Sequence, residues 1–417
     1  MVDGRCGPRL RRQYCALIEL AYCDAKGRIY FDPSREPLGD GGVVRNVRDD
    51  ELIAAPPGTM PMVLPGRRPL LERGSSRGEY TLAVALPAGY TRLLLPAYTK
   101  EEGAPALPLF GYTFACARAD VLYVAAMQTD EAEEWRPRDV SDGTLERMIE
   151  RKRQRDPSNR VLLQLERCAR DYGCFTAQNV FFEIGEAALP VSPSCNAQCI
   201  GCISELADDR GVTAPQVRIG FETTPQELAR IAIAHLEKVP DGIVSFGQGC
   251  EGEPLLRSIT IARAIETIRQ QTAVGTINLN TNGSQPDALR RCIEAGLQAV
   301  RISLNSFRPD IYAAYYRPRG YDLDDVFESI RISVAAGLRV SLNYLTHPGV
   351  TDDRAEIDAA RDFLRRIPVQ MVQTRTLNID PEWYFDAVGR PVEPIGMRRA
   401  LQALQQSAAL GNFTHTH

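Results

Sequence analysis

The chain has 417 residues, 44% of them hydrophobic and 24% charged, which is ordinary for a soluble globular protein of two or three domains. Its formal net charge of −4 argues against broad non-specific binding to nucleic acids. No apolar run approaches membrane-spanning length, so no membrane association is expected. The odd count of 11 cysteines, without a secretory segment, predicts a cytoplasmic location and free or ligating thiols.

Residues 1–140 predict a small β-rich domain. Short apolar or alternating runs are separated by turns rich in glycine and proline, which is typical of short strands. The predicted strands span residues 15–22, 28–31, 80–86, 91–95, 110–117 and 120–127. No motif in this part indicates chemistry, so we expect it to cap a site elsewhere in the chain or to bind a macromolecular substrate.

A helical connector is predicted over residues 141–186, with helices at 144–155 and 159–172. The first helix alternates charge signs, which indicates a solvated face. Cys168 and Cys174 lie near the end of the second helix. Two interpretations stay open for these cysteines: they pack at the helix end, or they contribute to an auxiliary cluster, for which no further cysteine pair is visible.

From residue 187 to 384 the pattern alternates between strand and helix, before a C-terminal helix and flexible tail over 385–417. The predicted strands span 187–191, 242–246, 274–280, 299–304, 339–344 and 369–377, and the helices 224–237, 258–272, 285–295, 323–335 and 352–366. Successive βα units predict an α/β fold whose parallel sheet is curled or partly closed as a barrel. In such folds the chemistry lies at the carboxyl ends of the strands.

The loop after the first of these strands, residues 192–202, carries the best-defined motif. Cys195, Cys199 and Cys202 have C-x3-C-x2-C spacing, which allows three thiolates to bind one metal ion or metal cluster. An iron–sulfur cube held by three cysteines leaves one iron open, whereas a structural zinc site needs a fourth ligand such as Cys250. A zinc or redox-inert site in a binding protein is therefore the alternative to an enzyme.

Polar residues follow each of the other strands. A glycine-rich turn at 247–255 allows close backbone approach to a ligand, and its carboxylates can bind an ammonium group. The third and fourth strands end in small polar groups that can hydrogen-bond hydroxyls or a carboxylate. The candidate residues on the second to sixth strand ends are Cys250, Glu251, Gly252, Glu253, Asn280, Asn282, Ser303, Asn305, Tyr344, His347 and Arg375.

Taken together and in order, these motifs resemble the radical S-adenosylmethionine (SAM) superfamily. The matching stretches are the cysteine loop, 252–255, 281–283, 303–305 and 348–352. The resemblance implies a partial (βα)6 TIM-like barrel that binds a [4Fe–4S] cluster and SAM. It also implies reductive cleavage of SAM to a 5′-deoxyadenosyl radical, which abstracts hydrogen from an unidentified substrate, either a small molecule or a macromolecule.

The resemblance also implies residue roles. Cys195, Cys199 and Cys202 would bind the cluster, and a reducing partner such as flavodoxin or ferredoxin would supply electrons. Gly252 and Glu253 would hold the amino group of SAM, with Glu251 as the alternative. The nucleoside and carboxylate of SAM would contact residues of the third and fourth strand ends, namely Asn280, Asn282, Ser303 and Asn305. Four residues are expected to face substrate, although Cys250 either donates hydrogen or simply packs: Cys250, Tyr344, His347 and Arg375.

Overall fold

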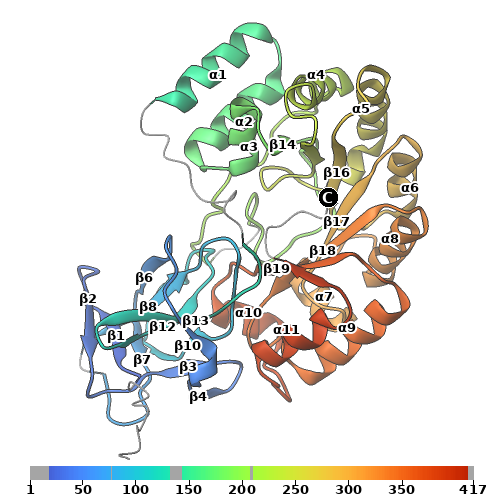
Figure 1. Cartoon of the computed structure of the whole chain (residues 1–417). Coiled ribbons are helices and arrows are strands. Elements are labelled where there is room, and N and C mark those ends of the chain that lie inside the picture. Colours follow the sequence, from blue (N-terminus) through green and yellow to red (C-terminus); the bar gives the residue numbers. More distant parts are fainter. Residues whose placement is uncertain (1–17, 77, 132–142, 207–209, 412–417) are drawn as a thin grey trace, which may run out of the picture.

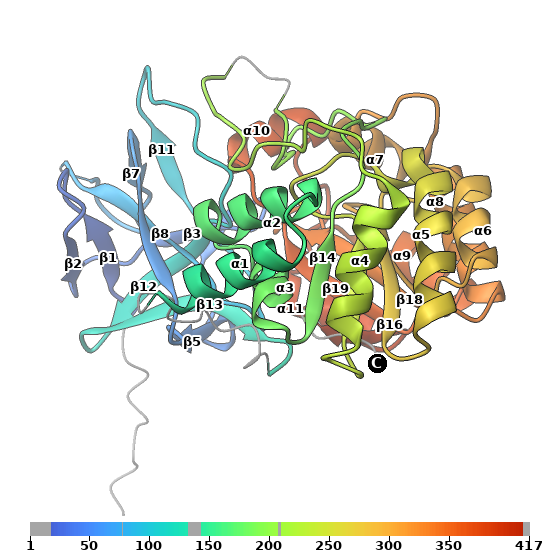
Figure 2. The same cartoon turned by 90° about the horizontal axis from the view of Figure 1, so that it is seen from above.

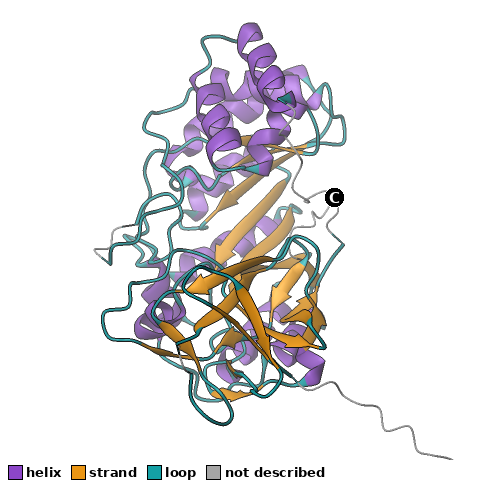
Figure 3. Cartoon of the chain, turned by 90° about the vertical axis from the view of Figure 1, so that its left-hand side faces the viewer, coloured by secondary structure: helices purple, strands orange, loops and turns teal. Residues whose placement is uncertain are grey.

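The structure, a computed structural model, describes residues 18–76, 78–131, 143–206 and 210–411. Three parts follow one another along the chain in Figure 1: N-terminal strands in blue to teal, a group of green helices, and a sheet with surrounding helices in yellow to red. In Figure 3 helices gather in the upper half of the view, and the strand-rich part lies in the lower half, in front of further helices. Within the described ranges, no helix is long and apolar enough to cross a membrane.

The N-terminal part is built on an antiparallel sheet with the strand order β2-β1-β8-β12-β13-β5, to which β6 and β9 add at the side. Its strands are β1 (Leu20–Cys23), β2 (Ile29–Asp32), β5 (Leu52–Ala54), β6 (Met60–Leu64), β8 (Tyr80–Ala85), β9 (Tyr90–Arg92), β12 (Thr113–Arg118) and β13 (Val121–Gln128). Two small sheets pair β3 (Leu38–Asp40), β4 (Val44–Asn46) and β10 (Leu95–Pro96), and β7 (Arg67–Pro69) with β11 (Tyr98–Lys100). The β-rich character predicted for this part is confirmed.

Three helices connect this part to the second sheet. The two predicted helices are confirmed as α1 (Thr144–Arg155) and α2 (Arg160–Asp171). A third helix, α3 (Phe175–Phe182), was not predicted, because its apolar residues do not fall on one face at the spacing of an amphipathic helix.

The second sheet has parallel strands in sequence order, and the predicted partial barrel is confirmed. The strands are β14 (Glu186–Leu189), β15 (Ile243–Phe246), β16 (Thr276–Thr281), β17 (Ala299–Leu304), β18 (Arg339–Thr346), β19 (Met371–Thr376) and β20 (Ala409–Gly411). The first six match the predicted strands closely. The last, β20, was not predicted, because three residues after a helix carry no strand pattern of their own.

Helices cover the outer face of this sheet (Figure 2). Five were predicted: α4 (Pro225–Leu236), α5 (Ser258–Gln271), α6 (Pro286–Glu294), α8 (Leu323–Ala335) and α9 (Arg354–Arg366). A C-terminal helix was also predicted, and α11 (Met397–Gln405) is that helix. Two short helices, α7 (Pro309–Tyr316) and α10 (Pro381–Val388), were not predicted.

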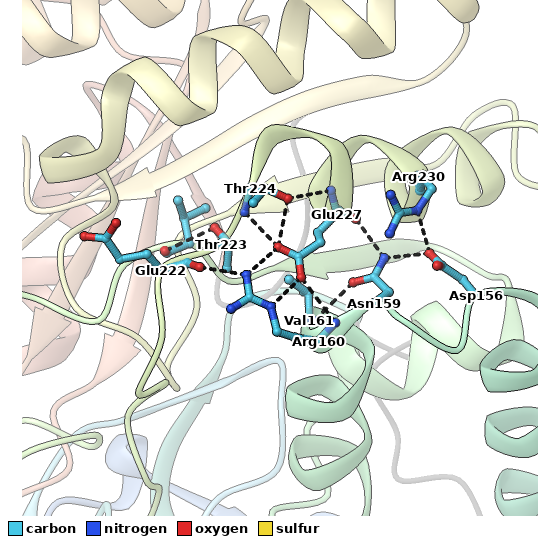
Figure 4. Close-up of polar contacts among 10 residues, drawn as sticks. Asp156, Asn159, Arg160, Val161, Glu222, Thr223, Thr224, Glu227 and Arg230 are labelled. Carbon is cyan, nitrogen blue, oxygen red and sulfur yellow. Dashed lines mark hydrogen bonds and ion pairs between the residues drawn. The ribbon is translucent and has the colours of Figure 1, made fainter.

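The start of α4 joins the connector to the barrel (Figure 4). Thr224 caps the helix and Pro225 occupies its first position, while the Glu227 carboxylate accepts a hydrogen bond from the backbone N–H of Thr224. The carboxylate of Glu227 also accepts two hydrogen bonds, at 2.8 and 2.9 Å, from the guanidinium of Arg160, which is the first residue of α2. The Glu227 carboxylate therefore caps the first turn of α4 and also holds α2 of the connector against α4.

Candidate functional site

The cysteine loop lies at the carboxyl edge of the parallel sheet, directly after β14. Cys195, Cys199 and Cys202 are all partly buried, and the backbone N–H of Cys202 donates to the carbonyl of Cys199 at 3.2 Å. Burial raises the pKa of Cys195 to about 11 and that of Cys199 above its usual value. The thiolate form therefore needs positive charge from a bound metal group or a neighbouring cation.

The glycine-rich turn after β15 is in direct backbone contact with this loop. Gly252 donates to the carbonyl of Ser192 at 2.8 Å, and Glu253 donates to that of Ser194 at 2.9 Å. A Cβ atom at Gly252 would overlap the Ser194 carbonyl group. Only glycine therefore allows the turn to approach the cysteine loop so closely.

Glu253 ties this turn to the end of β16. Its carboxylate accepts hydrogen bonds from the Asn282 backbone at 2.8 Å and from the Thr281 hydroxyl. The Asn282 side chain then donates to Asn196 of the cysteine loop at 3.1 Å. Burial is the main cause that raises the pKa of Glu253, to about 7, so a bound cation would favour its charged form.

A helix that sequence reasoning missed holds the other side of the cysteine loop. The backbone of Ile200 donates to the carbonyl of Tyr315 at 3.1 Å, and Gln198 donates to that of Tyr316 at 3.0 Å, both in α7. Beyond α7, Arg319 donates to the carbonyl of Asn196 at 2.9 Å. Backbone bonds of this kind depend on no particular side chain, so no motif in the sequence marks them.

Half-buried side chains form one wall along the carboxyl halves of the middle strands. Most other side chains on β16 to β19 are buried. Those of the wall keep partial access to solvent: Asn280, Ser303, Asn343, Leu345 and Arg375. The predicted residues Asn280, Ser303 and Arg375 are thus brought onto one surface. Asn343 and Leu345 were missed as site residues, although strand alternation puts Leu345 on the same face as Asn343.

Residues 189–360 match the sequence description of the Radical SAM superfamily. These residues form a radical SAM domain. Enzymes of this superfamily use a [4Fe–4S] cluster and SAM, and the match covers the cysteine loop, the glycine-rich turn and the ends of β16, β17 and β18. The family resemblance predicted from the motifs is therefore confirmed.

Two curated relatives and one solved structure illustrate the similarity. The "FeMo cofactor biosynthesis protein NifB" of Klebsiella pneumoniae is 28% identical over 39% of this chain and 37% of its own. A "GTP 3',8-cyclase" of Staphylococcus carnosus is 25% identical over 51% of this chain and 61% of its own. A radical SAM methyltransferase structure from Sphaerobacter thermophilus aligns with a TM-score of 0.41 and 19% identity over 54% of this chain and 66% of its own. The chain spans about half the length of the curated relatives that it matches.

Three predicted residues of the radical SAM domain lie away from the half-buried wall. Tyr344 points to the outer helices, where its hydroxyl donates to Glu356 at 2.7 Å, because it alternates with inward-facing neighbours on β18. Asn305 is fully buried and donates to the Tyr384 hydroxyl at 3.0 Å. His347 is also fully buried, with its ring 4.7 Å from that of Tyr384. The expectation that Tyr344 and His347 line the mouth does not fit their positions.

Glu251 serves a different purpose from the one expected. Its carboxylate accepts hydrogen bonds from the backbone N–H groups of Val191 and Ser192, both at 2.7 Å, and from Gln248 at 2.7 Å. It therefore braces the glycine-rich turn against the end of β14. Burial raises its pKa to about 8.

Cys250 lies in the same turn but not with the three loop cysteines. It is only 4% exposed and forms a hydrogen bond with Cys168, which together with burial raises the pKa of Cys250. Cys174, near Cys168, adds to that electrostatic effect. Cys250 and Cys168 thus contact each other across the connector and the turn.

The donor set of this radical SAM domain fits an iron–sulfur cluster better than a single metal ion. In the described part of the chain, no three His, Cys, Asp or Glu side chains are close enough to hold one ion. A cube of four irons binds its cysteines further apart than a single ion does, and the backbone of Cys195 lies against Gly252 of the turn. The alternative in which Cys250 completes a zinc site does not fit its contact with Cys168.

Proposed function

We propose that this chain is an enzyme that holds a [4Fe–4S] cluster on Cys195, Cys199 and Cys202 and binds SAM beside it. The observation that carries the proposal is the backbone contact between the cysteine loop and the turn at Gly252, at the carboxyl edge of a parallel sheet. When bound, the cluster and SAM supply a 5′-deoxyadenosyl radical, which abstracts hydrogen from the substrate. The remaining steps are binding and orientation by this chain's own residues.

The amino group of SAM is assigned to the turn that contains Gly252 and Glu253. The missing side chain at Gly252 leaves room for close approach, and the Glu253 carboxylate supplies negative charge for an ammonium group. Its pKa of about 7 means that cation binding would release a proton near neutral pH. Glu251 is left out of the SAM contacts because its hydrogen bonds brace the turn.

The half-buried wall is assigned to the nucleoside and the substrate. Asn282 orients the cysteine loop through Asn196, and Asn280 and Ser303 offer polar atoms for the ribose and carboxylate. Arg375, further along the wall, is assigned to the substrate. Asn305 is proposed as a supporting residue, because its side-chain N–H donates to the hydroxyl of the buried Tyr384.

The predicted β-rich domain, residues 1–140, is proposed to cover one side of the substrate entrance. A cavity of about 310 Å³ lies where this part meets the barrel, and its lining includes Lys100, Arg210 and Trp383. Arg210 follows the cysteine loop, and Trp383 lies on α10 after β19. The cavity is large enough for part of a small molecule or for a side chain of a macromolecule. The reducing conditions that the cluster needs make the cytoplasm the proposed location.

The test is a direct assay for SAM cleavage. Anaerobically reconstituted protein should contain iron and sulfide for one cluster, and chromatography should detect 5′-deoxyadenosine after reduction with dithionite. Cys195→Ala should lose the cluster and the product together. Cys23→Ala, a buried cysteine in the N-terminal sheet, is the matched control and should retain both.

Two results would contradict the proposal. The first is protein that carries stoichiometric zinc without sulfide when it is purified under argon, which would support a structural metal site. The second is an intact cluster that yields no 5′-deoxyadenosine with several reductants.

A further inference from the structure

Two adjacent tyrosines of α7 hold their hydroxyl groups beside the cysteine loop. Tyr315 and Tyr316 are each only 4% exposed. On the same helix, Tyr312 donates to the hydroxyl of Tyr321 at 3.4 Å. In the described part of the chain, the buried hydroxyl of Tyr316 has no hydrogen-bond partner, and that of Tyr315 donates to none. A buried donor without an acceptor destabilises a fold, so these two hydroxyls indicate an acceptor from outside the chain.

The hydroxyl of Tyr315 lies where a side chain of the cysteine loop would otherwise be. A Cβ atom at Gly201 would be 3.1 Å from this hydroxyl oxygen. Gly201 directly precedes Cys202 in the sequence. Burial is the main cause that raises the pKa of Tyr315 well above its ordinary value, and negative charge on Cys199 and Cys202 raises it further. The hydroxyl is therefore close to both cysteines.

Tyr316 is held against the same part of the loop. Its ring stacks on that of Tyr312 with centroids 4.5 Å apart, and it meets the ring of Tyr315 edge-on at 5.0 Å. Burial raises the pKa of Tyr316 well above its ordinary value, and Tyr312 and Cys199 add to that shift. Raised pKa values keep the proton on the oxygen, so Tyr315 and Tyr316 both remain hydrogen-bond donors beside Cys199.

We propose that the hydroxyls of Tyr315 and Tyr316 donate hydrogen bonds to sulfur atoms of the bound cluster next to Cys199, and that they thereby raise its reduction potential. This inference rests on the proposed function, in which Cys199 holds the cluster. Reduction adds one electron to the cluster, so its sulfur atoms become stronger acceptors. Donors beside them stabilise the reduced form more than the oxidised form.

The experiment removes each hydroxyl and keeps its ring. Tyr315→Phe, Tyr316→Phe and the double variant are reconstituted anaerobically and titrated with dithionite, and electron paramagnetic resonance measures the reduced cluster at each potential. At one fixed potential, the ratio of reduced to oxidised cluster should be on the order of 10-fold lower in the double variant than in the unchanged protein. For one electron this corresponds to a midpoint lower by about 59 mV. Each single variant should lie between the two.

Tyr312→Phe is the matched control. It removes a hydroxyl from the same helix and the same ring stack, but one that already donates to Tyr321. Its ratio of reduced to oxidised cluster should agree with that of the unchanged protein within about twofold. Iron and sulfide are measured in every variant, so that a shifted potential is compared only between intact clusters. A double variant that holds no cluster is replaced by the two single variants.

Pulsed electron–nuclear double resonance of the reduced cluster tests the contact without catalysis. Protein prepared in H2O should show proton couplings that are lost in D2O. Some of these exchangeable couplings should be missing from Tyr315→Phe and from Tyr316→Phe, whereas Tyr312→Phe should keep all of them. This measurement distinguishes a hydrogen bond from a change in packing, because a packing change removes no exchangeable proton.

An unchanged potential with unchanged exchangeable couplings in both single variants would overturn the proposal. A shift of equal size in Tyr312→Phe would overturn it as well, because packing of the ring stack would then set the potential. An effect in only one of the two single variants would overturn it for the other tyrosine. Failure of the proposed function looks different: the protein takes up no iron and sulfide, or it holds a cluster that yields no 5′-deoxyadenosine. In the second case the potentials of the variants still decide the role of the tyrosines.

Discussion

At the scale of single residues, Arg218 is the cation that matters most to the cysteine loop. Its guanidinium donates to the Cys202 sulfur at 3.7 Å and to the Ser204 hydroxyl at 3.2 Å. Burial raises the pKa of Cys195 and of Cys199, and the charge of Arg218 opposes that shift. A cation beside the sulfurs stabilises added negative charge, so it makes a bound cluster easier to reduce.

Arg218→Gln should therefore lower the reduction potential of the cluster, by on the order of tens of millivolts. A redox titration followed by electron paramagnetic resonance measures this shift in reconstituted protein. Arg218→Lys keeps the charge and should restore most of the potential, and Arg230→Gln on the outer surface of α4 should change nothing. A potential that is the same in all three variants would show that Arg218 only supports the loop.

At the scale of elements, α4, α8 and α9 begin at side-chain caps, and the start of α4 also contacts the connector. Burial raises the pKa of Glu227, but hydrogen bonds from Arg160 and Thr224 outweigh it and hold the pKa at about 2 (Figure 4). In the unfolded chain the same carboxyl titrates near 4.3. The charged carboxylate therefore stabilises the fold above that pH, and this contribution is lost as the pH falls toward 2.

Glu227→Gln should lower the free energy of unfolding by about 1–2 kcal/mol at pH 7, a value discounted because Arg160 is partly exposed. Urea unfolding at pH 7 and at pH 3 measures the effect. The difference between the variant and the unchanged protein should shrink at pH 3. Asp325→Asn changes the equivalent residue in the first turn of α8, which has no arginine partner within the described part of the chain, and should cost less. An equal difference at both pH values would contradict the assigned role of the charge.

At the scale of the molecule, the N-terminal sheet is fixed to the barrel through buried groups. Arg67 is fully buried, and it pairs at 3.1 Å with Asp380, which also caps α10. Arg92 is fully buried as well and donates to the carbonyl of Leu377 at 2.9 Å, just beyond β19. Apolar residues of both parts, including Phe114 and Leu401, share one core. The part predicted as a separate β-rich domain is thus anchored at the strand ends that carry the site.

Asp380→Asn should lower the free energy of unfolding by about 2–3 kcal/mol, because it leaves the buried Arg67 charge with only its longer ion pair, at 3.6 Å, to Glu382. Chemical denaturation measures the loss. Arg67→Met/Asp380→Asn removes both charges and should recover part of it. Asp287→Asn breaks an exposed pair with Arg290 and should cost less than about 1 kcal/mol. No recovery in the double variant would mean that hydrogen bonds of Asp380, rather than its charge, hold this contact.

The sequence by itself determined the order of the barrel strands and the position of the cysteine loop. Both depend on residues that are close in the chain: runs of apolar residues, caps such as Thr224, and the spacing of Cys195, Cys199 and Cys202. Gly252 and Glu253 were also predicted, because a turn that needs glycine has a local signature. Local signals of this kind do not require knowledge of what packs against them.

Tertiary structure alone decided which predicted residues face the site. Tyr344 and Leu345 are neighbours, yet a shift of one residue along a strand moves a side chain to the opposite face of the sheet. Cys250 contacts Cys168, and the last carbonyls of α7 accept backbone hydrogen bonds from the cysteine loop. Both contacts join segments that are far apart in the sequence. Such contacts depend on the packing of the whole chain, because the local sequence of one segment does not indicate which distant segment it will contact.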